Sequence, residues 1–285
     1  MVIPENPIKQ TLDTIVESTS RSRKNTNLPA SFSVFEAGDR NLNVNRGEVP
    51  PVVVKEGKSA FHVTFQKGKT LPAGSNASFT MVPKGFFPTE QLRMAFKLYL
   101  EDNWPWEESQ GQNVAGKLFG YKIGSGSASG GNFSTTAASL RLTFKDKGHA
   151  HGYLYPQLKQ NIDKDRGDTL GWSVLDQSKE LQKIASETAG VRVFLPPENT
   201  MQFKKGQWND IVMFVKLNTP GKYDGVLEIS VNGKTQRTES VRYRYTDKLK
   251  IDAVEISPFF GGGDLTYAPR ETTRAWYSEF GFSKT

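Results

Sequence analysis

The 285-residue sequence contains no cysteine, which excludes disulfide bonds, thiolate metal sites and cysteine nucleophiles but does not determine the compartment. It also has no run of 18 consecutive apolar residues, so no transmembrane helix and no membrane partner are expected. The first residues lack the basic and apolar regions of a secretory signal, and no signal peptide is therefore visible.

Several patterns that mark common functions are missing as well. Zinc-finger spacing, RNP-type aromatic runs and long Lys/Arg blocks do not occur, which argues against a nucleic-acid partner. The excess of basic residues, 37 against 30 acidic ones, gives a net charge of +7 and predicts some other anionic partner. A generally basic surface without a specific partner explains the charge equally well.

The signs of hydrolase, metal and nucleotide sites are weak. The Glu-x-Asp-x-x-Glu pattern of sandwich glucanases is absent, although hydrolysis of a glycosidic bond usually needs two carboxylates. His149 and His151 could share one face of a strand, but no third metal ligand is evident. The glycine-rich segment 124–131 lacks the ending of a phosphate-binding loop. No metal and no cofactor are expected.

The sequence does contain many short runs rich in Val, Ile, Thr, Tyr and Phe, separated by turns. Residues 228–234 are typical of a hairpin that turns at Asn232-Gly233. Many strands with little helix predict an all-β fold, a two-sheet β-jelly roll sandwich with a few short helices. Strands are expected at 31–36, 52–55, 60–66, 78–82, 91–100, 139–145, 152–155, 191–195, 211–217, 225–232, 235–243, 251–259 and 274–282.

Two parts of the chain differ from this pattern. Residues 1–28 are predicted to be an N-terminal helix and linker segment, and residues 29–285 the jelly-roll domain. The helix in the first segment rests on apolar residues at i, i+4, i+7 and i+8, and the basic stretch 18–25 after it is interpreted as a linker or surface strap. A second helix is expected at 176–188, with Asp176 as its N-cap and Gly190 at its end.

Two pairs of polar residues, Ser139 with Arg141 and Tyr153 with Tyr155, are each spaced two apart. Residues i and i+2 of a strand face the same side, about 6–7 Å apart. A serine beside an arginine suits an anionic sugar, and two tyrosines suit proton transfer. Lys117 is near in sequence. Each of these residues also has a purely structural explanation, as an exposed lysine or as part of an ordinary sheet face.

Such a set would suit β-elimination on a uronic-acid polymer. That reaction needs a cation near the C5 carboxylate, a base for the C5 proton and an acid for the departing O4. Arginine and lysine can supply the positive field, and a tyrosine or lysine of lowered pKa can move the proton. Because the base would be Lys or Tyr, activity is expected to rise towards alkaline pH.

At these residues the sequence resembles polysaccharide lyase family 14, the alginate and glucuronate lyases of marine molluscs and chlorella viruses. The matching segments are Arg93–Tyr99, Gly116–Gly120, Ser139–Arg141, Tyr153–Tyr155, Phe259–Asp264 and Ala268-Pro269, and the resemblance spans roughly residues 50–282. It is strongest to the chlorella-virus branch, which attacks glucuronate-containing polysaccharide of the algal cell wall.

The resemblance implies a jelly roll with a cleft across one sheet and a polysaccharide lyase activity. It implies a catalytic set of Lys117, Arg141, Tyr153 and Tyr155, with Ser139, Arg93 and Lys97 binding substrate. Lys117 and Arg141 would neutralise the uronate carboxylate, and the base would be Lys117, Tyr153 or Tyr155. The expected partner is a glucuronate-containing acidic polysaccharide, or alginate, bound by a monomer.

Two further alternatives remain open from the sequence. One is a lectin-like module of the same fold that binds acidic glycans without cutting them. The other is an anion-binding structural protein, for instance on a virus particle, without a defined sugar cleft. A wall-degrading activity is expected to act outside the cell or from a virus particle, although no signal peptide supports simple secretion.

Overall fold

The computed structural model describes residues 32–106, 113–130, 132–158, 176–187, 190–194, 200–262 and 264–284. The helix and linker expected at 1–28 lie outside the described residues, so the boundary at residue 28 stays a prediction. None of the described helices is long and apolar enough to span a membrane.

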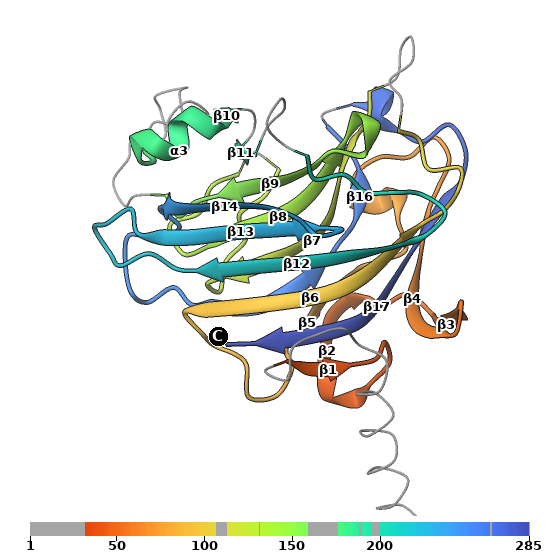
Figure 1. The fold of residues 1–285 in the computed structure, drawn as a ribbon, viewed down its shortest axis with the longest axis horizontal. Coiled ribbons are helices and arrows are strands. Elements are labelled where there is room, and N and C mark those ends of the chain that lie inside the picture. The colour runs from red at the N-terminus through yellow and green to blue at the C-terminus, as the bar shows by residue number, and fades with distance from the viewer. Residues whose placement is uncertain are drawn as a thin grey trace, which may run out of the picture.

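Two antiparallel sheets form the described part of the chain and confirm the two-sheet sandwich (Figure 1). Sheet I has the order β14 (Lys234–Val241), β13 (Gly225–Val231), β12 (Trp208–Lys216), β6 (Gln91–Leu100), β17 (Thr273–Ser283), β4 (Lys58–Phe65) and β3 (Val52–Lys55), with β1 (Ser33–Phe35) against β17. Sheet II has the order β10 (Ala185–Glu187), β11 (Val191–Val193), β9 (Ala150–Tyr155), β8 (Ala138–Lys145), β7 (Ala115–Ile123), β15 (Ile251–Ile256), β5 (Ser78–Met81) and β2 (Val44–Glu48), with β16 (Phe259–Phe260) against β7.

Local sequence patterns correctly predicted several elements. The expected strand 91–100 is β6, with the same bounds. The hairpin at Asn232-Gly233 is confirmed, because Val231 pairs with Lys234 and both turn residues have positive φ, 52° and 78°. A two-residue turn with positive φ at both positions matches the twist of the flanking strands, and Asn-Gly adopts it readily.

The second expected helix is shorter than predicted. The α-helix α3 spans only Lys179–Ile184, and residues 185–187 continue as β10. Ser178, not Asp176, is the N-cap, since its hydroxyl accepts a hydrogen bond from the Leu181 N–H at 3.0 Å. The carboxylate of Asp176 is occupied elsewhere, in an ion pair with Arg242 and a hydrogen bond from the Tyr245 hydroxyl. The remaining short helices of the described chain are 3-10 turns at Arg40–Leu42, Pro72–Gly74, Asp146–Gly148 and Leu265–Tyr267.

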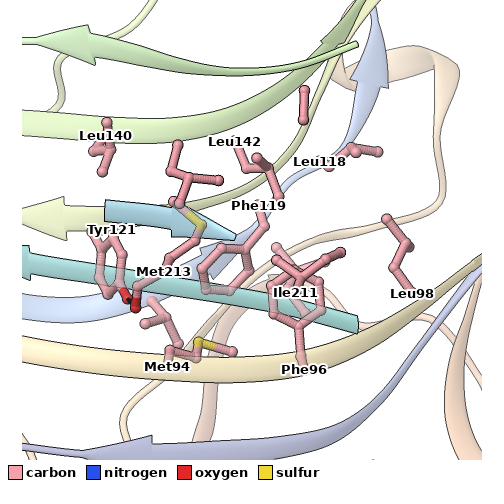
Figure 2. Close-up of a cluster of buried hydrophobic side chains, with 14 of the residues drawn as sticks. Met94, Phe96, Leu98, Leu118, Phe119, Tyr121, Leu140, Leu142, Ile211 and Met213 are labelled. Carbon is pink, nitrogen blue, oxygen red and sulfur yellow. Dashed lines mark hydrogen bonds between the residues drawn. The ribbon is translucent and has the colours of Figure 1, made fainter. Parts of the chain in front are cut away.

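The core lies between the two sheets (Figure 2). Side chains from β6 and β12 of sheet I meet those from β7 and β8 of sheet II; they include Met94, Phe96, Ile211 and Met213 on one side and Leu118, Phe119, Tyr121, Leu140 and Leu142 on the other. The buried Tyr121 hydroxyl donates to the Met213 carbonyl at 2.8 Å and so joins the sheets. Because side chains alternate along a strand, polar residues of sheet II are directed to its outer face.

Candidate active site

The register of β8 and β9 brings the two polar pairs together. Ser139 pairs directly with Tyr155, and Arg141 pairs directly with Tyr153. Directly paired residues of antiparallel strands lie on the same face. All four side chains therefore share the outer face of sheet II, on strands about 4.8 Å apart.

A β-bulge in β7 adds Lys117 to this face. Lys117 pairs with Thr143, but the next pair along is Phe119 with Leu142, so Leu118 is an extra residue. Leu118 and Phe119 both face the core. The alternation therefore changes at the bulge, which is what such an insertion does to a strand.

The Lys117 amine lies among aromatic rings. Its Nζ is 4.9 Å from the ring centre of Tyr155, 5.5 Å from that of Tyr153 and 5.4 Å from that of Phe259. Burial, together with the charge of Arg141, lowers the pKa of Lys117 from 10.5 to about 7, and the charge of Glu255 opposes this shift. A neutral amine is thus accessible near physiological pH, as a general base requires.

Arg141 is a buried and fully oriented cation. Its Nη1 contacts Glu255 Oε2 at 2.5 Å, and its Nη2 donates to the Ser257 carbonyl at 2.8 Å. The side chain, only 4% exposed, crosses β7 over Gly120. A Cβ at Gly120 would lie 2.4 Å from Arg141 Cδ, so only glycine leaves room for this path.

The two tyrosine rings lie side by side, with centroids 5.3 Å apart and planes inclined by 40°. Gly190 leaves space for them, because a Cβ there would be 2.6 Å from Tyr153 Cε1 and 3.2 Å from Tyr155 Cε1. The sequence suggested Gly190 as the end of a helix. The structure instead places it beneath the tyrosine pair.

Ser139 already uses its hydroxyl within the protein. The Oγ atom donates to the Ala128 carbonyl at 2.5 Å and so attaches the glycine-rich loop to β8. Its residue is buried, with 6% of its surface exposed. In this arrangement Ser139 orders the rim of the site.

Arg93 and Lys97, expected to bind substrate, are not brought together with the other five residues. Both lie on β6 of sheet I and alternate with core residues, so they face the opposite outer surface of the sandwich. There Arg93 pairs with Glu228 and Lys97 with Asp210, each at 2.5 Å. The structure therefore does not bring Arg93 and Lys97 to the face that holds Lys117, and their role in substrate binding stays a prediction.

Glu255, Phe259 and Gly120 belong to the site but were not predicted as functional. Glu255 on β15 pairs with Gly120 of β7, and Phe259 on β16 pairs with Lys117 of β7. The members of each pair are more than a hundred residues apart in sequence. No local spacing rule could have indicated those partners. Within the described ranges, no group of three His, Asp or Glu side chains is arranged to hold a metal ion.

The comparison with known proteins agrees with this geometry. The Polysaccharide lyase 14 family profile matches residues 53–280, which include every strand of the site. The chain belongs to the Polysaccharide lyase 14 family. Two solved structures of similar fold are the alginate lyase vAL-1 from Chlorella virus and the marine PL-14 alginate lyase from Aplysia kurodai. The first is 22% identical with a TM-score of 0.66, covering 95% of this chain and 97% of the other; the second is 21% identical with a TM-score of 0.64, covering 93% and 95%.

A curated relative of this lyase-family chain is Exolysin of Paramecium bursaria Chlorella virus 1. The two are 24% identical over 130 residues, which is 45% of this chain and 19% of Exolysin. The chain thus matches about a fifth of that relative's length.

Proposed function

We propose that this chain cleaves a glucuronate-containing acidic polysaccharide by metal-independent β-elimination, leaving 4,5-unsaturated uronate ends. The observation that carries the proposal is the Lys117 amine, with its pKa near 7, held against the rings of Tyr153 and Tyr155 and close to the charge of Arg141.

Lys117 is the proposed base. The lowered pKa makes its neutral amine abundant above about pH 7, and a neutral amine can take the C5 proton but cannot neutralise the carboxylate. The electrons of the C5–H bond then form the C4=C5 double bond as the C4–O4 bond breaks. Arg141, fixed and buried next to the amine, provides positive charge for the carbanion-like transition state.

A tyrosine is the proposed acid. The rings of Tyr153 and Tyr155 both lie within 5.5 Å of the Lys117 amine, and a phenolic hydroxyl can donate a proton to the departing O4. Tyr153 is the more exposed of the two. After the product leaves, Lys117 loses the proton it took and the tyrosine regains the one it gave. This transfer occurs directly or through solvent and restores the starting state.

Glucuronate is proposed as the sugar because the sequence resembles the chlorella-virus branch of the family. Alginate is the second candidate, since the two solved neighbours named above are both alginate lyases. The enzyme is proposed to act outside a cell or from a virus particle, as a monomer. A lectin-like module of the same fold is the non-catalytic alternative.

One assay separates these possibilities. The full chain is incubated with polyglucuronate and with alginate, each with and without chelator, and ultraviolet absorbance from the new C=C bond is followed. We expect product from polyglucuronate, unaffected by chelator, and almost none from Lys117→Ala, whose fold is checked by circular dichroism. Binding without unsaturated product would support the lectin alternative, and a fully active Lys117→Ala would overturn the site assignment.

A further inference from the structure

Arg192 occupies a position in the site that the reaction above does not use. It lies at the centre of β11, and its neighbours Val191 and Val193 face the core. Arg192 pairs directly with Tyr153, so its side chain is on the same outer face of sheet II as the tyrosine. It is partly exposed.

The guanidinium of Arg192 is also available in a way that the guanidinium of Arg141 is not. The ion pairs within the described ranges use other cations, and none includes Arg192. Arg141, in contrast, has both terminal nitrogens engaged by Glu255 and Ser257. A substrate carboxylate would have to displace Glu255 to reach Arg141, whereas it could reach Arg192 directly.

The neighbouring His151 does not compete for an anion. It lies on the same face of β9, two residues before Tyr153. Burial, with the charges of Arg192, Lys145 and His149, lowers the pKa of His151 to about 3, and the Phe194 backbone opposes this shift. The imidazole is therefore uncharged near neutral pH, whereas Arg192, which pairs with Tyr153, carries a charge that can attract an anion.

We propose that Arg192 binds the carboxylate of a uronate residue on the far side of Tyr153 from Arg141. This inference rests on the proposed function for its substrate class, an acidic polysaccharide. Arg141, Tyr153 and Arg192 are paired in succession on the neighbouring strands β8, β9 and β11. Neighbouring strands lie about 4.8 Å apart. A sugar chain that crosses these strands meets the buried Arg141, then Tyr153, then the partly exposed guanidinium of Arg192.

The planar fork of arginine suits this role, because it can donate two parallel hydrogen bonds to one carboxylate. The two arginines then have separate tasks: Arg141 acts on the reacting centre through its field, and Arg192 holds the polymer in register. Arg192 is a substrate-binding residue in this arrangement and does not take part in proton transfer.

Binding without cleavage tests the proposal. The parent is the full-length Lys117→Ala chain, and the ligand is a saturated glucuronate oligomer, with affinity measured by calorimetry. Adding Arg192→Ala should weaken binding about 10- to 100-fold, as expected for loss of a charge-assisted hydrogen bond. Adding Arg192→Lys should recover part of the loss, since charge returns without the fork.

Two controls isolate the carboxylate contact. Arg237→Ala removes the same charge from the outer face of sheet I, where Arg237 pairs with Glu228 and Glu239, and should leave affinity within twofold of the parent. The carboxyl-reduced oligomer should bind the parent and the Arg192→Ala variant alike. Thermal unfolding of each variant confirms that it is folded.

The outcomes for the two proposals are distinct. The role of Arg192 would be overturned if the parent and Arg192→Ala bound the oligomer with equal affinity, or if the parent bound no oligomer. It would also be overturned if Arg192→Ala weakened binding of the carboxyl-reduced oligomer as much as binding of the glucuronate oligomer. Failure of the wild-type chain to form unsaturated product would overturn the proposed lyase reaction. If the affinity for the oligomer still depended on Arg192 in that case, the proposed carboxylate site would stand.

Discussion

At the scale of single residues, opposing effects determine the charge of Lys117. The faces of three aromatic rings favour the ammonium, by up to about 2 kcal/mol for a desolvated cation–π contact. Burial and the charge of Arg141 favour the amine. A pKa lowered from 10.5 to about 7 corresponds to roughly 5 kcal/mol, at about 1.4 kcal/mol per unit, so burial wins.

The first prediction concerns the pH dependence of the reaction. We expect kcat/KM to rise between about pH 6 and 8 and then to level off, because the free enzyme's Lys117 loses its proton near pH 7. Initial rates over pH 5 to 11 in buffers of constant ionic strength measure this. A rate that peaks near pH 5 and falls above it would contradict Lys117 as the base.

The second prediction concerns stability. The folded pKa of Lys117 lies below its unfolded value, so the charged side chain destabilises the fold fully below about pH 7, and this cost disappears as pH rises towards 10.5. Lys117→Met should therefore raise the free energy of unfolding by a few kcal/mol at pH 6 and by much less near pH 10. Urea denaturation at both pH values tests this, and an equal gain at both would contradict it.

The third prediction uses the carboxylate opposite Arg141. Glu255 raises the pKa of Lys117, so Glu255→Gln should lower that pKa and move the rise in kcat/KM to lower pH. The amide keeps the size of the side chain and can still accept from Arg141. Asp210→Asn, on the other sheet, is the control and should leave the profile in place. A shift to higher pH would show that Glu255 does not act through this charge.

At the scale of elements, β7 brings Lys117 to the site, although local reasoning did not predict it as a strand. Gly116 and Gly120 lower its strand propensity, yet both are required by close contacts. A Cβ at Gly116 would be 2.4 Å from the Phe144 ring, and one at Gly120 would be 2.6 Å from the Leu140 carbonyl. The two glycines that weaken the strand signal thus leave room for the Phe144 ring at Gly116 and for the Arg141 side chain at Gly120.

The fourth prediction follows from that contact. Gly120→Ala should destabilise the protein by about 1–3 kcal/mol, the range for overpacking, and should reduce kcat because Arg141 must move. Gly152→Ala on β9 is the milder comparison, since the closest atoms to its Cβ would be the side-chain ends of Leu227 and Ile229, at 3.2 and 3.3 Å. Thermal unfolding and steady-state kinetics of both variants test this, and equal behaviour would contradict it.

At the scale of the whole molecule, the two outer faces of the sandwich carry their charges differently. On sheet I, basic residues such as Arg93 and Arg237 are paired with acidic neighbours, both of them with Glu228. On sheet II, Lys117 and Arg192 have no ion-pair partner within the described ranges. Arg192, which stays charged when Lys117 is neutral, is therefore expected to attract a polyanion to the face that holds the site.

The fifth prediction concerns salt. The KM for a long polyuronate should increase with sodium chloride, because the Debye length falls from about 30 Å at 0.01 M to 3 Å at 1 M. The kcat should change little, since the charges around Lys117 are buried and poorly screened. Kinetics over that salt range test this, with a KM independent of salt as the contradicting result.

Alternation along single strands, read from the sequence, placed Ser139 beside Arg141 and Tyr153 beside Tyr155, and Asn232-Gly233 marked its hairpin. These features depend on backbone geometry over a few residues, which local sequence determines. Tertiary structure alone decided that a bulge turns Lys117 to the same face, that Glu255 holds Arg141 and that Arg93 and Lys97 lie across the sandwich. Strand pairing and register join residues more than a hundred positions apart, and those partners are selected by core packing between whole sheets.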